Sequence, residues 1–108
     1  MAEQKPTIST TTQQAGSKLS LPSETTMKNA ARLAISEDKP IMLDYWTASL
    51  EKKACLGVRE SGEKLLVKSE EEYTSPIGKF YKSDKEYIVI TENSIYIVSA
   101  EIQPRKIS

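Results

Sequence analysis

The sequence contains no histidine and a single cysteine, Cys55. Without an imidazole there can be no Ser-His-Asp or Cys-His nucleophile and no zinc site that uses histidine. One cysteine cannot form an internal disulfide or a CxxC motif, which is typical of the cytoplasm or another reducing compartment. We therefore predict no catalytic residues, no metal ligands and no cofactor.

Net charge and long apolar runs are also missing. The chain carries 15 Lys and Arg against 15 Asp and Glu. As a whole it therefore exerts no long-range attraction on phosphate or on an acidic membrane. Residues 39–108 alone have 11 charges of each sign. No stretch approaches the roughly 20 apolar residues that a membrane span needs, so we expect no membrane segment.

The first part of the chain has few groups that could build a core. Residues 1–26 contain thirteen Ser, Thr or Gln and none of the seven aromatic residues. Such a segment buries too little apolar surface to offset an ordering cost of roughly 1–2 kcal/mol per residue. We predict that residues 1–23 are a disordered polar tail when the protein is alone. If this arm orders on a neighbouring subunit, its candidate anchors are Ile8, Leu19 and Leu21.

An amphipathic helix is predicted after this tail. Thr25 or Thr26 can cap its first turn with a side-chain hydroxyl. Apolar residues then recur at three- and four-residue spacing, at Met27, Ala30, Ala31, Ala34 and Ile35. This spacing places them on one face of about three helical turns. The helix is expected to end at Lys39-Pro40, because the residue before a proline is pushed out of the helical region.

The remainder of the chain has the pattern of a β-sheet. Short apolar and β-branched runs predict six strands, near 41–47, 52–59, 63–68, 77–82, 86–91 and 94–100. Connections this short favour antiparallel neighbours. We predict a mainly β (α+β) fold, with one N-terminal helix followed by an antiparallel meander of five to six strands. The predicted domain spans residues 24–103 and is followed by a short C-terminal tail at 104–108.

The last two predicted strands are apolar on both faces. Residues 87–90 and 95–98 consist of Tyr, Ile and Val without interruption. Both faces of this hairpin therefore need cover, and the helix can supply one of them. A meander of short strands can supply the other by curling into a small SH3-like or OB-like barrel.

Three short patterns suggest chemistry but lack its essential groups. Residues 38–46 resemble the central strand of thioredoxins, yet residues 47–50 supply no cysteine and redox chemistry needs two thiols. Cys55 is expected to pack as a small apolar residue. Glutamates 70–72 are expected in a solvated loop, with a weak cation site or a contact for a basic partner as the alternative. An enzyme is therefore the least favoured function.

Aromatic residues form the candidate interaction surface. One short helix cannot cover all the apolar strand faces, so we expect a strand edge or an aromatic patch to bind a protein, in a homo-oligomer or a larger assembly. The candidate interaction surface consists of Tyr45, Trp46, Tyr73, Phe80 and Tyr81. The alternative is a small barrel that binds single-stranded nucleic acid by stacking bases beside lysines. That groove would be basic only if charges segregate, which the sequence does not show.

Two segments carry a resemblance to viral proteins. Residues 71–77 (EEYTSPI) and 87–98 (YIVITENSIYIV) resemble small uncharacterised proteins of large nucleocytoplasmic DNA viruses. With residues 38–46 included, the resemblance covers residues 31–99. It implies a short accessory or virion component with no assigned activity. We predict a non-enzymatic structural or protein-interaction module, such as a minor virion or assembly component whose N-terminal arm orders on binding.

Overall fold

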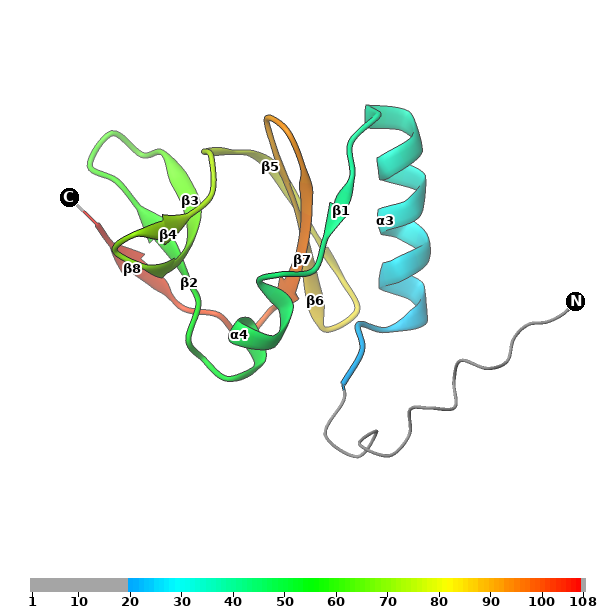
Figure 1. The fold of residues 1–108 in the computed structure, drawn as a ribbon, viewed down its shortest axis with the longest axis horizontal. Helices are drawn as coiled ribbons and strands as arrows, with labels where there is room; N and C mark the ends of the chain where they lie inside the picture. The colour runs from blue at the N-terminus through cyan, green and yellow to red at the C-terminus, as the bar shows by residue number, and fades with distance from the viewer. Residues whose placement is uncertain (1–19, 108) are drawn as a thin grey trace, which may run out of the picture.

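A computed structural model describes residues 20–107, which form two helices and eight strands. In chain order these are α3 (Glu24–Glu37), β1 (Ile41–Met42), α4 (Trp46–Leu50), β2 (Cys55–Val58), β3 (Lys64–Ser69), β4 (Glu72–Tyr73), β5 (Ile77–Ser83), β6 (Glu86–Thr91), β7 (Ile95–Ser99) and β8 (Pro104–Lys106). The strands form two four-stranded sheets (Figure 1). The first sheet has the order β1-β7-β6-β5, and the second sheet has the order β4-β3-β2-β8.

The mainly β fold class is confirmed, but the simple meander and the barrel are wrong. Most neighbouring strands are antiparallel, whereas the pairs β1–β7 and β2–β8 are parallel. Each sheet keeps two edge strands, so the described strands form no closed barrel. The predicted C-terminal tail is also wrong, because β8 pairs with β2 and places Arg105 opposite Gly57. Ile102, 8% exposed, anchors the crossing from β7 to β8 between the sheets.

Helix α3 covers one face of the first sheet (Figure 1). The side chains between them form what we call the helix core: Ala30, Trp46, Ile88, Ile90, Ile95 and Ile97, with Met27, Leu33, Ala34 and Ile41 at its margin. Alternate residues of a strand point to opposite faces, so the intervening residues of β6 and β7 face the second sheet. Both faces of this hairpin are therefore covered, as its apolar pattern predicts.

The other face of the first sheet packs against the second sheet. The buried side chains here form what we call the inter-sheet core: Tyr45, Ala54, Leu66, Val89, Val98 and Ile102, with Ala48, Leu56, Ile77, Tyr87 and Tyr96 at its margin. Leu66 is fully buried and comes from the central part of β3. The second sheet thus replaces the barrel wall that the sequence pattern suggested.

The start of α3 differs in detail from the predicted cap. The cap is Ser23, whose hydroxyl accepts a hydrogen bond from the Thr26 amide at 3.1 Å. Thr26 itself is fully buried, while Ile35, predicted for the apolar face, is 83% exposed. The helix ends at Glu37, and Asp38 follows in the left-handed conformation with φ 58°. Lys39-Pro40 lies just beyond this end, where proline was expected to stop the helix.

The predicted strand at 41–47 is wrong beyond its first two residues. The chain leaves β1 after Met42, and the Trp46 amide donates to the Leu43 carbonyl at 3.1 Å to begin the turn into α4. The Ser49 hydroxyl donates to the Trp46 carbonyl at 2.6 Å and accepts the Ser99 amide at 2.9 Å. The bond to the Ser99 amide attaches α4 to the end of β7 and satisfies a backbone group beyond the β7 residues that pair with β1.

Candidate functional site

Two of the five candidate interaction residues are core residues. Tyr45 is 3% exposed and Trp46 is 7% exposed, so their assignment to an interaction surface is wrong. They are neighbours in the chain but enter different cores, Trp46 the helix core and Tyr45 the inter-sheet core. The turn into α4 makes this possible at the edge of the first sheet. The Trp46 indole N–H donates to the Ser20 carbonyl at 2.8 Å.

Tyr45 lies in a polarised environment between the sheets. Its ring makes an edge contact with Tyr96, with 5.4 Å between centroids, and the Lys68 ammonium lies 4.7 Å from the Tyr45 centroid. Burial, together with the smaller effect of the negative charge of Glu72, raises the pKa of Tyr45 to about 12. The phenol therefore stays neutral over the physiological range and acts as a packing group.

The other three candidates are exposed, and they lie on two different surfaces. Tyr73 is 54% exposed and lies on β4 in the second sheet. Phe80 and Tyr81 are 41% and 43% exposed and lie on β5 in the first sheet. The structure therefore divides the predicted aromatic patch into a second-sheet site and a β5 site.

Of the three candidate tail anchors, Leu21 is the one within the described residues. Leu21 is 76% exposed, so it does not act as an anchor within this chain. Ile8 and Leu19 lie outside the described residues. The described chain begins next to Trp46, at the Ser20 carbonyl that the indole binds.

Strand β5 is an edge of the first sheet with side chains exposed on both faces. It pairs with β6 on one side, from Lys79↔Ile90 to Ser83↔Glu86, and has no strand on its other side among the described residues. Phe80 faces the second sheet and packs edge-on against Tyr87, with 5.3 Å between centroids. Tyr81 faces α3 and lines a small pocket of about 320 Å³ with Arg32 and Leu33.

A wider groove of about 940 Å³ lies on the second sheet, and its charged lining residues are mainly cations. Its charged lining consists of Lys52, Lys53, Arg59, Lys68 and Arg105 against the single carboxylate of Glu70. The remaining lining is Ala54, Cys55, Leu65, Val67, Ser69, Tyr73 and Ile107. We call this site the basic groove. Charge is therefore segregated in a chain whose total charge is zero.

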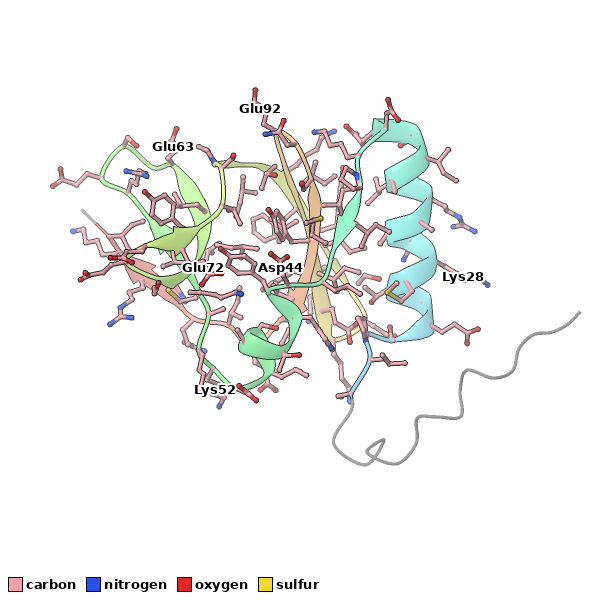
Figure 2. All side chains as sticks on the ribbon, viewed as in Figure 1. Lys28, Asp44, Lys52, Glu63, Glu72 and Glu92 are labelled. Carbon is pink, nitrogen blue, oxygen red and sulfur yellow. The ribbon has the colours of Figure 1, made fainter. Side chains whose placement is uncertain are left out.

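Sequence reasoning missed this groove because its cations come from distant parts of the chain. Lys52 and Lys53 follow α4 in a turn where Lys52 has φ 61° (Figure 2). Arg59 follows β2, and Arg105 reaches the same sheet through the parallel pairing of β8 with β2. No local sequence pattern predicts that pairing, because β8 is only three residues long.

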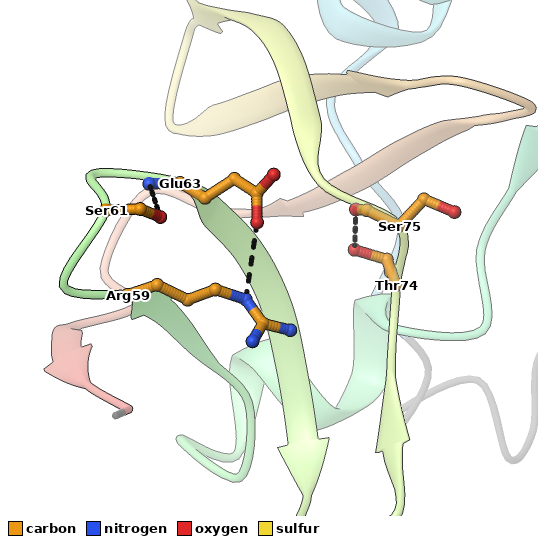
Figure 3. Close-up of polar contacts among 5 residues, drawn as sticks. All are labelled: Arg59, Ser61, Glu63, Thr74 and Ser75. Atoms are coloured by element: carbon orange, nitrogen blue, oxygen red, sulfur yellow. Dashed lines mark hydrogen bonds and ion pairs between the residues drawn. The ribbon is translucent and has the colours of Figure 1, made fainter.

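Three groove cations have carboxylate neighbours. Lys53 lies 3.6 Å from Glu51, and Lys68 lies 3.3 Å from Glu72. Arg59 Nε lies 3.4 Å from Glu63 Oε1 across the β2–β3 hairpin (Figure 3). That contact is close enough for an ion pair, but it does not have hydrogen-bond geometry. Arg59 Nε is shielded from solvent, and it has no hydrogen-bond partner among the described residues.

Cys55 and glutamates 70–72 lie on the second sheet and in its β3–β4 turn. Cys55 is half-buried on the groove wall, and the chain has no histidine to deprotonate it. Glu70, Glu71 and Glu72 are all exposed. Within residues 20–107, no three side chains of the metal-ligating types His, Cys, Asp and Glu gather around a common point. The helices of this part of the chain are also too short or too polar to cross a membrane.

The most elaborate polar cluster is structural. The buried Glu86 carboxylate contacts the Thr26 hydroxyl at 2.6 Å and accepts the Ser23 amide at 3.3 Å. It thereby places a negative group at the N-terminus of α3, where the helix dipole favours one. Ser83 completes the cluster, which joins α3 to the β5–β6 hairpin.

These two surfaces, the β5 edge and the basic groove, are the features from which a function can be argued. No family model, no curated protein and no solved structure matches the chain.

Proposed function

We propose that this protein is a non-enzymatic protein-interaction module that self-associates through the edge of β5. The observation that carries the proposal is the exposure of this strand: seven residues long, at the edge of the first sheet, with Phe80 and Tyr81 about two-fifths exposed on opposite faces. An edge strand has backbone N–H and C=O groups that can pair with another strand. A partner strand would extend the first sheet and cover both rings.

The other sheet edges in the described chain are less suited to pairing. Strands β1 and β4 have two residues each, and β8 has three. Each can offer few backbone groups to a partner. Main-chain hydrogen bonds supply much of the affinity when a strand is added to a sheet edge, so β5 is the edge with the most to offer.

The two lysines of β5 are compatible with a second copy of the same strand as the partner. Because strand residues alternate between faces, antiparallel pairing of two β5 strands places residues of equal parity opposite one another. Lys79 and Lys82 differ in parity and never face each other directly. Like charges directly opposite would be destabilising.

The same rule selects the register. With Phe80 opposite its own copy, Lys79 pairs with Tyr81, which allows a cation–π contact. With Tyr81 opposite its own copy, Phe80 pairs with Lys82. Registers centred on Lys79 or on Lys82 would place a lysine opposite its own copy and are disfavoured. Two central registers remain, and both cover the aromatic rings.

The wider setting of this module follows from the same features. A chain with one cysteine is suited to a reducing compartment such as the cytoplasm. Leu21 is exposed beside the Ser20 carbonyl that Trp46 holds, so it is available to a neighbouring subunit. A minor virion or assembly component is a role in which such contacts would be repeated.

The test is the molar mass in solution as a function of concentration. Size-exclusion chromatography with light scattering of the full chain is expected to show a monomer–dimer equilibrium, because a single strand pair is a small interface. Tyr81→Lys should abolish the dimer, since the introduced ammonium would lie opposite Lys79 of the other copy in one register and opposite its own equivalent in the other. Tyr73→Lys is the matched control, because Tyr73 is an exposed tyrosine outside β5, at 54% against 43% for Tyr81.

Circular dichroism of both variants establishes that they are folded. A dimer in the wild type and in Tyr73→Lys, with a monomer in Tyr81→Lys, supports the proposal. A wild type that stays monomeric at millimolar concentration contradicts it, and so does a dimer that Tyr81→Lys leaves intact.

A further inference from the structure

We propose that the basic groove of the second sheet binds a single strand of nucleic acid. This site is separate from the β5 edge and does not depend on self-association. The groove combines five cationic side chains, one carboxylate and an exposed tyrosine over an apolar floor. Grooves that bind single strands without sequence preference use this combination of cations for the backbone and aromatic rings for the bases.

The fold itself segregates the charge. Side chains along a strand alternate between the two faces of a sheet, and the outward face of β2, β3 and β8 carries Cys55, Val67 and Arg105 in register around Gly57. The inward face packs against the first sheet through Leu56 and Leu66. The groove is therefore the face of the second sheet that no other described element covers.

The floor of the groove is closely packed, although its walls are open. A Cβ atom at Gly57 would lie 2.8 Å from Ile107 Cδ1 and 2.8 Å from Val67 Cγ2. Ile107 thus lies over Gly57, held by its amide, which donates to the Val58 carbonyl at 2.9 Å. A base resting on this floor would contact apolar side chains rather than unpaired backbone groups.

The cations are available to phosphate. Among residues 20–107 the ion pairs do not include Lys52 or Arg105. The Lys53–Glu51 pair has side-chain exposures of 74% and 54%, and exposed pairs of this kind contribute about 0–1 kcal/mol. The Arg59 side chain is 40% exposed, and Glu63 does not hydrogen-bond its Nε. A phosphate oxygen can therefore replace these carboxylates at low cost.

Lys68 has a different role from the other groove cations. Its ammonium lies over the Tyr45 ring and beside Glu72, so it is engaged at the groove wall. We assign the backbone contacts to Lys52, Lys53, Arg59 and Arg105. Tyr73 opposes Val67 across the β3–β4 pair and is the stacking platform.

Tyr73 distinguishes this ligand from other polyanions. Base stacking on an exposed aromatic ring contributes to single-strand binding, whereas an acidic peptide presents no bases. A duplex hides its bases inside the helix and would use the cations alone. We therefore assign the groove to a single strand, and an acidic peptide and a duplex serve as competitors in the test.

The test is fluorescence anisotropy with a labelled oligo-dT, using the full chain over a range of salt concentrations. Four phosphate contacts on a single strand predict a slope of log K against log salt of about −3. Lys52→Asn removes one cation and suits the left-handed backbone at that position. It should reduce the slope by about 0.7. Lys28→Gln, on α3 at the opposite side of the molecule, is the matched control (Figure 2).

A second pair of variants tests stacking. Tyr73→Ser should weaken oligo-dT binding by roughly 5- to 150-fold while leaving the salt slope unchanged. Tyr81→Ser, which removes an exposed ring on β5, should leave oligo-dT affinity within about two-fold of the wild type.

Several outcomes would overturn the assignment. These are absence of binding at low salt, binding of polyglutamate or duplex DNA as tight as that of oligo-dT, and equal effects of Lys28→Gln and Lys52→Asn. A Tyr73→Ser variant that is folded and retains full affinity would also overturn it. Because no expected result depends on dimer formation, failure here would leave the β5 proposal standing.

Discussion

The two sheets share one chain but differ in how their faces are used. The first sheet is covered on both sides, by α3 and by the second sheet, and nearly every residue of β6 and β7 is buried. The second sheet is covered on one side, and its other side is the basic groove. The comparison indicates that the first sheet supplies most of the stability and offers an edge, whereas the second sheet offers a face.

A cavity in the first sheet should lower the free energy of unfolding more than any other change considered. Ile97 is fully buried in the helix core, so Ile97→Ala should lower the free energy of unfolding by about 2–5 kcal/mol. Val67 lies half-buried in the groove floor, and Val67→Ala should cost about 1 kcal/mol. Urea unfolding with a common m-value measures both.

Equal losses in these two variants would contradict a larger contribution of the first sheet to stability, because they would mean that the second sheet contributes as much. A loss in Ile97→Ala that is at least twice the loss in Val67→Ala supports the larger contribution of the first sheet. Leu66→Ala provides a reference inside the second sheet, since Leu66 is fully buried but faces the inter-sheet core.

The next effect concerns the attachment of α3 to the first sheet. The Thr26 hydroxyl has one proton, and its shortest contact is 2.6 Å to Glu86 Oε1. Thr26→Val has the same shape but leaves this buried carboxylate without that donor, which should cost about 1–3 kcal/mol. Thr25→Val is the control, because Thr25 is exposed on the same turn. A neutral Thr26→Val would show that the Thr26–Glu86 contact does not help to hold α3 on the first sheet.

Much of the first sheet could be predicted from the sequence, because long apolar strands carry a strong pattern. The predicted strands at 77–82, 86–91 and 94–100 correspond to β5, β6 and β7 within one or two residues. The need for cover on both faces also follows from residues 87–90 and 95–98. By contrast, β4 and β8 have two and three residues, too few for any periodicity to appear.

The candidate sites were less predictable, for two physical reasons. Tyr45 and Trp46 look like surface aromatics in a strand, but the turn into α4 buries each in a different core. The basic groove depends on the parallel pairing that brings Arg105 beside Gly57, and nonlocal pairing leaves no trace in composition. Tyr73, Phe80 and Tyr81 were identified as exposed, but their division between two sheets required the strand order.

Alkaline pH tests the junction between the sheets, where Tyr45 lies. Burial raises the pKa of Tyr45 from its ordinary value of 10.0 to about 12. The unfolded chain loses this proton first, so the stabilisation is complete below pH 10 and is lost as pH rises through 12. The loss between these pH values is about 2 kcal/mol. Comparing unfolding curves of the wild type and Tyr45→Phe over this pH range measures the contribution of the Tyr45 proton, since the variant lacks it. Parallel pH dependence in the two proteins would contradict it.

The smallest effect compares one glycine from each sheet. Gly57→Ala would bring a Cβ to 2.8 Å from Ile107 and Val67, whereas at Gly78 on β5 the nearest atom, the Ile90 carbonyl oxygen, lies at 3.6 Å. Neither glycine has a positive φ. Alanine is otherwise favoured over glycine in a strand by roughly 0.5–1 kcal/mol. Gly78→Ala should therefore stabilise slightly, and Gly57→Ala should destabilise by less than about 1 kcal/mol, because Ile107 can move aside. Ile107→Ala in the Gly57→Ala background should recover part of that loss. If Gly57→Ala proves as favourable as Gly78→Ala in urea unfolding, Ile107 does not close the groove floor, and the second sheet is more open than this packing indicates.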